Sequence, residues 1–136
     1  MPQTPSTEIV VPFVFTSSGG VAATSNYADI IRQHIVAIIS TYKGERVMRP
    51  TYGAQLLDEL FQPLEEVQAA QIEADLREAI DAEEPAANVV RIVVEEGEDA
   101  GSSGFRVTVH YSVRPLDDSV FEASALFDPT LAEEFI

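Results

Sequence analysis

The sequence predicts an α+β domain in which helices pack on one face of a small antiparallel sheet of about three C-terminal strands. Apolar residues recur at helical spacing before Asp81, and the spacing changes to strict alternation after Pro85. Turn residues then join the alternating segments as hairpins, which is typical of this class. The 136 residues, 46% of them apolar, suffice for one domain with its own core. We expect an N-terminal arm over residues 1–26 and a single domain over residues 27–136.

The first expected element is an extended arm or edge strand. Its apolar run, residues 9–15, contains Pro12, which cannot donate to a strand ladder. A helix is then predicted from Tyr27 to Thr41, with Asn26 as its N-cap. Isoleucine has only moderate helix propensity, so this helix should depend on packing against the core. Its expected core stripe is Ile31, Ile35, Ile38 and Ile39.

Residues 41–53 are expected to form an ordered loop, because Gly44, Pro50 and Gly53 interrupt any regular pattern. A short helix should follow near residues 56–61. Pro63 is well placed to begin a longer helix that reaches about Asp81. Glu73 and Arg77 have the i, i+4 spacing that supports a helix. The expected core stripe of the long helix is Ala69, Ile72, Leu76, Ala79 and Ile80.

Three strands are predicted after Pro85. In the first, Val90, Ile92 and Val94 should share one face. The second, over residues 105–114, has the clearest alternation and should be the central strand. The third, over residues 120–127, has a weaker pattern and should be an edge, with these residues on one face: Phe121, Ala123, Ala125 and Phe127.

The net charge of −15 opposes a role in binding nucleic acid or anionic lipid. Residues 1–54 carry four basic and three acidic groups, whereas residues 55–100 carry two basic and 14 acidic groups. This asymmetry is consistent with a protein packed between unlike neighbours, or with a solvated acidic helix beside a neutral core. No apolar run approaches the ~20 residues of a membrane span, and the polar start shows no secretory signal.

The sequence predicts no catalytic, metal or cofactor site. There is no cysteine, and His34 and His110 lack carboxylates at metal-ligand spacing. The adjacent acids at 83–84, 95–96 and 117–118 are expected to be solvated charges rather than a glycosidase pair, which needs two carboxyl groups facing across a cleft. Neither a nucleophile elbow nor a phosphate loop is present.

The loop at 43–53 concentrates three cations, Lys43, Arg46 and Arg49, in an acidic chain. One interpretation is a structural loop whose arginines pair with the acidic helix. The other is a contact surface for another chain, where arginine is enriched. We expect Arg46 to be the anchor and to pair with a buried carboxylate.

The order of residues here resembles the baseplate-wedge sheath-initiator family of contractile phage tails and contractile injection systems. The resemblance covers roughly residues 10–115, and its most specific part is the Gly-Glu-Arg-Val-Met block at 44–48. Leu60-Phe61-x-Pro63 and Glu84-Pro85 also fit, but Ala86 stands where the family often has arginine. The candidate contact residues combine motif positions with two cations of the loop, Lys43 and Arg49. The motif positions among them are Gly44, Glu45, Arg46, Pro50, Gly53, Glu84 and Pro85.

The resemblance implies a non-enzymatic protein, present in six copies, that joins the tube and hub to the wedges and begins the sheath. Its partners would be sheath, wedge, tube or hub, and spike proteins, in a particle assembled in the cytoplasm. Some family members carry a lysozyme-like label, so a cell-wall hydrolase is the alternative, and an adaptor of a non-contractile particle is a third.

The resemblance also suggests that sheath subunits exchange strands with the initiator, which requires an unpaired strand edge. Acidic side chains at Asp117, Asp118 and Glu122 would keep the free protein from pairing with itself. The expected pairing segment consists of Val120, Phe121, Glu122, Ala123, Ser124, Ala125 and Leu126.

Overall fold

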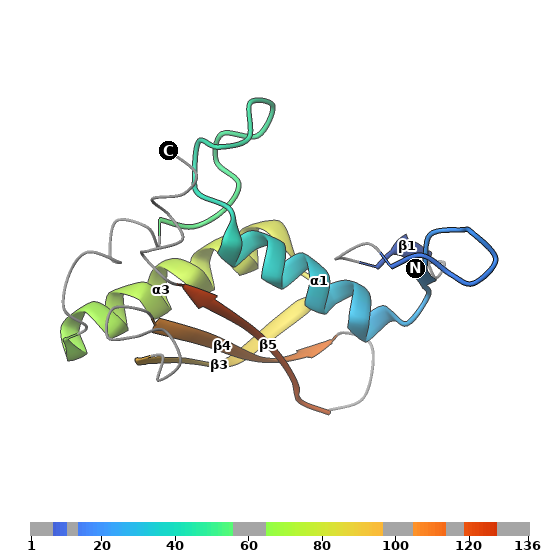
Figure 1. Ribbon diagram of the computed structural model, residues 1–136. Helices are drawn as coiled ribbons and strands as arrows, with labels where there is room; N and C mark the ends of the chain where they lie inside the picture. Colours follow the sequence, from blue (N-terminus) through green and yellow to red (C-terminus); the bar gives the residue numbers. More distant parts are fainter. Residues whose placement is uncertain (1–6, 11–13, 56–64, 97–104, 114–118, 128–136) are drawn as a thin grey trace.

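Two helices lie over one face of a three-stranded antiparallel sheet (Figure 1). The computed structural model describes residues 7–10, 14–55, 65–96, 105–113 and 119–127. Within them the helices are α1 (Tyr27–Ser40) and α3 (Glu66–Glu83). The sheet has the order β3-β4-β5, from β3 (Ala87–Glu96), β4 (Phe105–Val113) and β5 (Phe121–Phe127). This arrangement confirms the predicted α+β class.

Helix α1 begins as predicted. The side chain of Asn26 accepts a hydrogen bond from the amide of Ala28 (3.1 Å), which caps the helix. The four isoleucines of the predicted stripe are at most 2% exposed, and Ile30 is buried beside them. Thr41 is the C-cap, and its hydroxyl donates to the carbonyl of Ala37 (2.6 Å). The helix therefore ends one residue earlier than expected.

Helix α3 begins at Glu66 rather than at the predicted Pro63, since Glu65 and Gln68 form a capping box. The expected ion pair between Glu73 and Arg77 is present at 3.3 Å. Arg77 also donates to the carbonyl of Val89 (3.0 Å), which ties α3 to β3. Of the predicted stripe, Ala69 is half-buried and the rest is buried: Ile72, Leu76, Ala79 and Ile80. The short helix expected at 56–61 lies outside the described residues.

The predicted face of β3 is wrong at Val90. This side chain is 51% exposed, because a β-bulge lies between Val89 and Arg91. Val89 pairs with Tyr111 and Arg91 pairs with His110, so Val90 is an extra residue without a partner in the ladder. One inserted residue reverses the alternation, so Val89 faces the core before the bulge and Ile92 faces it afterwards.

Strand β4 is the centre of the sheet, as predicted, and β5 is an edge that pairs with β4 along Phe121–Phe127. In β4 every second side chain from Phe105 to Val113 is at most 5% exposed. In β5 Ala123 is buried, whereas Glu122 and Ser124 are exposed. The turn expected at Asp117 and Asp118 lies outside the described residues. The edge of β5 opposite β4 has no strand partner in the described part of the chain.

The N-terminal segment forms a small hairpin of its own. Strand β1 (Glu8–Ile9) pairs antiparallel with β2 (Ala23–Thr24), and the pairing continues through a bridge between Phe15 and Val21. Figure 1 shows this hairpin beside the start of α1, away from the three-stranded sheet. Where one N-terminal edge strand was predicted, the structure has a pair of short strands, β1 and β2. The domain boundary at residue 26 stays a prediction.

Candidate functional site

The loop that follows α1, residues 41–54, is ordered, as expected. A short stem of backbone hydrogen bonds closes it. The amide of Ala54 donates to the carbonyl of Thr41 (2.9 Å), and the amide of Lys43 donates to the carbonyl of Ala54 (3.3 Å). The carboxylate of Glu45 accepts from the amide of Tyr42 (3.0 Å), which holds the first turn. Three further turn hydrogen bonds join Glu45 to Tyr42, Arg49 to Arg46 and Tyr52 to Arg49.

The arginines of this loop gather on one buried ring. Tyr52 is 7% exposed, and the guanidinium carbons of Arg46 and Arg49 lie 4.1 and 5.0 Å from its ring centroid. Arg49 also forms an ion pair with Glu83 at the end of α3. The expectation of a carboxylate partner for Arg46 is not met among the described residues. Arg46 stacks on Tyr52, and Arg49, three residues later, is the one that reaches α3.

Glu84 joins three parts of the chain. Its amide donates to the carbonyl of Ile80 (2.8 Å) and so caps α3, while its carboxylate is 2.6 Å from Nδ1 of His34 on α1. The Nε2 atom of His34 lies 2.9 Å from the carboxylate of Glu8 in β1. Pro85, next in the chain, is exposed. His34 therefore connects the N-terminal hairpin to the end of α3.

The expectation that Glu83 and Glu84 are solvated charges is wrong. Their side chains are only 13% and 12% exposed, and each has a cationic or ionisable partner from a distant segment. A carboxylate that loses water in this way is stable only when it is paired. Both groups are therefore structural, and they hold the loop and the N-terminal hairpin against the end of α3.

The pKa of His34 is raised above its ordinary value of 6.5. Burial lowers this pKa, but the hydrogen bonds and charges of Glu84 and Glu8 together raise it by more. A raised pKa in the folded state means that protonation favours folding. The contribution of His34 to the free energy of unfolding is complete below pH 6.5, which is its pKa in the unfolded chain. It is lost as the pH rises through the raised pKa of His34 in the folded protein.

We therefore expect the melting temperature to fall as the pH rises above 6.5 through the His34 titration. The variant His34→Gln should lose this pH dependence, because an amide does not titrate in this range. Differential scanning calorimetry across this range measures the melting temperature of both proteins. An equal pH dependence in wild type and His34→Gln would contradict a stabilising role for protonated His34.

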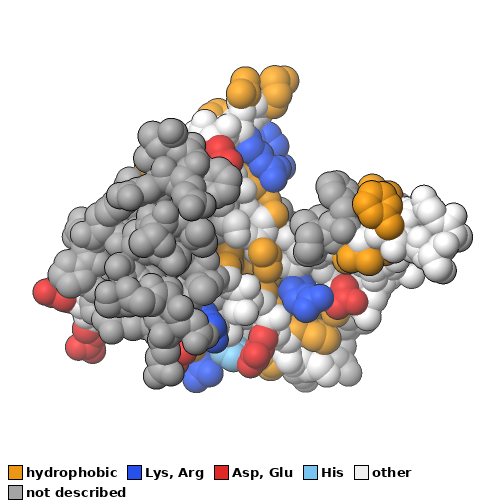
Figure 2. All heavy atoms as spheres, viewed as in Figure 1, with side chains coloured by type: hydrophobic (Ala, Val, Ile, Leu, Met, Phe, Trp, Pro, Cys, Tyr) orange, Lys and Arg blue, Asp and Glu red, His pale blue; other side chains and the backbone are white. Residues whose placement is uncertain are grey.

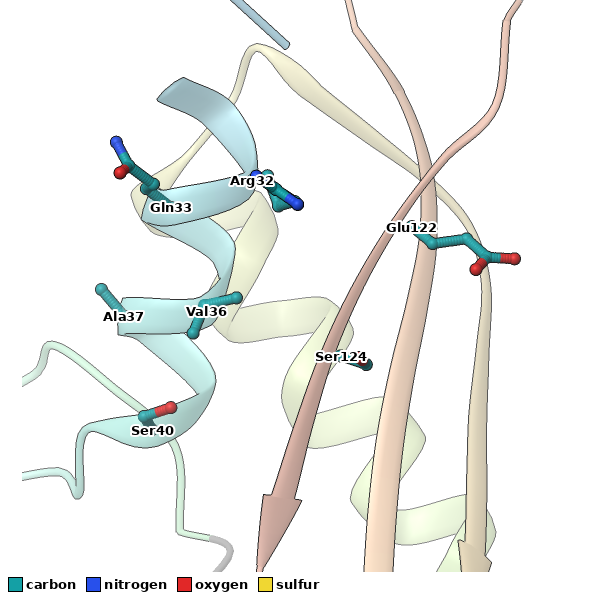
Figure 3. A pocket seen from close by; sticks show the side chains of 7 residues that line it. All are labelled: Arg32, Gln33, Val36, Ala37, Ser40, Glu122 and Ser124. Carbon is teal, nitrogen blue, oxygen red and sulfur yellow. The ribbon is translucent and has the colours of Figure 1, made fainter. Parts of the chain in front are cut away.

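A pocket of about 570 Å³ lies between α1 and β5 (Figure 3). In Figure 3, Arg32 and Val36 point from α1 toward β5, whereas Glu122 and Ser124 point from β5 away from α1. The pocket is thus bounded by the helix and by exposed positions of the edge strand. The sequence analysis named Glu122 and Ser124, on the strand side of the pocket, and missed the helix side. Its lining consists of Arg32, Gln33, Val36, Ala37, Ser40, Glu122 and Ser124.

The predicted contact residues therefore fall into two groups. The loop group is mostly exposed: Lys43, Gly44, Glu45, Arg46, Arg49 and Pro50. In the strand group Val120 and Glu122 are exposed, Phe121 and Ala125 are half-buried, and only the backbone pairing of Leu126 with Arg106 is described. His110 lies 3.4 Å from Glu122 across the β4–β5 pair.

The described residues bring together no group of three or more histidine and acidic side chains that could hold a metal ion. Within the same part of the chain, neither helix is apolar over a length that would cross a bilayer.

Three solved structures share this fold. A protein named as a candidate tail lysozyme from Geobacter sulfurreducens is 24% identical, with a TM-score of 0.64 over 85% of this chain and 94% of its own. A chain of the anti-feeding prophage baseplate is 23% identical, with a TM-score of 0.68 over 83% and 89%. A chain of the type VI secretion system baseplate complex is 14% identical, with a TM-score of 0.56 over 73% and 92%.

No curated protein matches the chain. The family described as baseplate wedge protein gp25 matches residues 25–117, which include α1, the loop, α3, β3 and β4. This match covers more than half of the chain and confirms the resemblance found in the sequence. The chain therefore belongs to the gp25 family of baseplate wedge proteins.

Proposed function

We propose that this protein is a structural baseplate component that joins the tube and hub to the wedges and begins the sheath by accepting strands from the first sheath ring. Its partners are then sheath, wedge, tube or hub, and spike proteins. Six copies per particle are supported by the similar chain in the six-fold symmetrised anti-feeding prophage baseplate. Such a particle would be assembled in the cytoplasm, as part of a virion or an injection system.

The observation that carries the proposal is the edge of β5 beside the pocket. A strand added to a sheet edge gains main-chain hydrogen bonds, and its alternate side chains need a surface to contact. Here the outer edge of β5 supplies the hydrogen-bonding groups, and Val36 and Ala37 of α1 supply an apolar surface next to it. Arg32 and Glu122 add one charge of each sign to the lining.

The second contact, to the wedge, is proposed at the loop and at Glu84-Pro85. The carboxylate of Glu84 is engaged by His34, so its role is to fix the local backbone while Pro85 remains exposed. Ala86, which replaces the arginine frequent in the family, packs partly buried against the core. The wedge contact therefore has no guanidinium at this position to donate paired hydrogen bonds. The cations of the loop are the candidates to replace that arginine.

A cell-wall hydrolase is the second candidate, favoured by the similar structure named as a candidate tail lysozyme. Glycoside hydrolysis requires two carboxyl groups facing each other across a sugar-binding cleft. In the described residues the two least exposed carboxylates among the ion pairs, Glu83 and Glu84, are engaged by Arg49 and His34. This arrangement gives them structural roles and favours the non-enzymatic function.

Two measurements on the purified protein separate these functions. Mixed with the sheath subunit of its own particle, the protein should form a complex that elutes earlier in size-exclusion chromatography than either component. Incubated with peptidoglycan, the same preparation should release no reducing ends, whereas hen lysozyme in parallel should release them. Release of reducing ends, or failure to bind the sheath subunit, would contradict the proposed function.

A further inference from the structure

The tip of the loop holds two large apolar side chains in water. Val47 and Met48 are 92% and 90% exposed, and they are the most exposed large hydrophobic residues in the described part of the chain. Figure 2 shows hydrophobic side chains at the end of the projecting loop, with lysine and arginine side chains beneath them. Apolar groups exposed in this way mark a contact site more often than a lone exposed residue does.

The fold keeps these side chains exposed. The loop stem is closed by backbone hydrogen bonds between Thr41 and Ala54, and the turns on either side of the tip are hydrogen-bonded as well. Arg46 and Arg49, which flank the tip, are both stacked on the buried ring of Tyr52. Because both flanks are fixed, the tip cannot readily turn inward to bury Val47 and Met48. A preorganised apolar projection of this kind loses little conformational entropy when it binds.

The charge around the tip indicates what it binds. Lys43, Arg46 and Arg49 lie near it in the loop beside a single acid, Glu45, whereas the chain as a whole has a net charge of −15. Stacking uses the flat face of the Arg46 guanidinium and leaves its edge N–H groups to donate to a carboxylate, whereas Arg49 already donates to Glu83. An anionic membrane would attract the tip but repel the rest of the protein. The partner is therefore a protein surface that is apolar at its centre and acidic at its rim.

A second copy of the chain is a poor match for this tip. The pocket between α1 and β5 carries one charge of each sign, from Arg32 and Glu122, so it does not offer the acidic rim that the loop cations need. We propose that Val47 and Met48 insert into an apolar socket of a different baseplate subunit, and that carboxylates on its rim pair with Lys43 and Arg46. This proposal deepens the wedge contact of the proposed function and is independent of strand addition at β5.

The chain contains no cysteine, so Met48→Cys places a unique thiol at the tip. In the free protein this thiol should react with a maleimide as fast as the thiol of Ala74→Cys, an exposed position on α3. In assembled particles the reaction of the tip thiol should slow by about tenfold or more, since a buried thiol is inaccessible to the reagent. Full labelling after denaturation shows that the variant is incorporated. An unchanged rate in particles would overturn the proposal.

A diazirine cross-linker attached to the thiol of Met48→Cys identifies the partner. In particles it should label one other baseplate protein, in a segment with acidic residues beside apolar ones. A cross-link to a second copy, to sheath or to lipid would overturn the proposal. Particles that lack a sheath should give the same cross-link, so this result is separable from strand addition at β5.

A charge placed at the tip provides the functional test. Val47→Asp should fold like wild type but be absent from purified particles, because an acid would enter the apolar socket and face its acidic rim. Val67→Asp is the matched control, since Val67 is also an exposed valine, at 76%, but lies on α3 away from the tip. This control should be incorporated normally. Normal incorporation of folded Val47→Asp would contradict the proposal.

Discussion

A proline at Ser124 or at Ala125 should abolish the sheath without unfolding the protein, and only one of the two positions should have this effect. Adjacent residues of a strand direct their N–H groups to opposite edges, so one of these amides faces β4 and the other faces the edge of β5 opposite β4. Proline removes the N–H group. At the position facing β4 it breaks the ladder and destabilises the domain. At the outward position it removes a donor that only an incoming strand would use.

The two variants control for each other. Circular dichroism melts of the free proteins identify the variant that keeps the wild-type stability. Electron microscopy of particles that carry this folded variant should then show tubes without sheaths. If those particles have normal sheaths and contain the folded variant, strand addition at this part of β5 is excluded.

Replacing Gly53 by alanine should destabilise the protein by about 3 kcal/mol or more. Gly53 has φ +105°, and a Cβ there would lie 2.2 Å from the carbonyl oxygen of Thr41. The stem must therefore move, which breaks the hydrogen bond from Ala54 to Thr41. Gly44 also has positive φ, at +91°, but a Cβ there meets nothing within 4 Å.

Gly44→Ala is therefore the matched control for the loop stem. It should cost only the strain of the backbone conformation, about 1–2 kcal/mol. Urea denaturation of the two variants measures the difference, which isolates the steric clash from the strain. Equal losses of stability would show that the stem adapts to a side chain at position 53, and would contradict the rigid loop on which the exposed tip depends.

The elements that the sequence predicted well are those in which one local pattern determines burial. In β4 the alternation from Phe105 to Val113 matches the burial of every residue, because the strand is central and regular. The isoleucine stripe of α1 is buried for the same reason. The prediction failed in β3, where the bulge at Val90 changes the phase. A run of valines and isoleucine fits either phase, so the pattern could not show the bulge.

The candidate site could be predicted only in part, because its contacts join distant segments. Glu83 pairs with a residue 34 positions earlier and Glu84 with one 50 positions earlier, and no spacing rule indicates such partners. Sequence alone also could not show whether Arg46 or Arg49 would reach α3. That choice depends on the turns around Tyr52. The edge position of β5 could be predicted, since a weakly patterned last strand follows a strong central one.

A cryo-electron microscopy map of the sheathed particle tests most directly whether this protein begins the sheath by strand addition. The proposal predicts that each copy has an extended sheath segment hydrogen-bonded along β5, with side chains of that segment in the pocket beside Val36. A map in which the edge of β5 is open to solvent, or is covered by a protein other than the sheath, would contradict it.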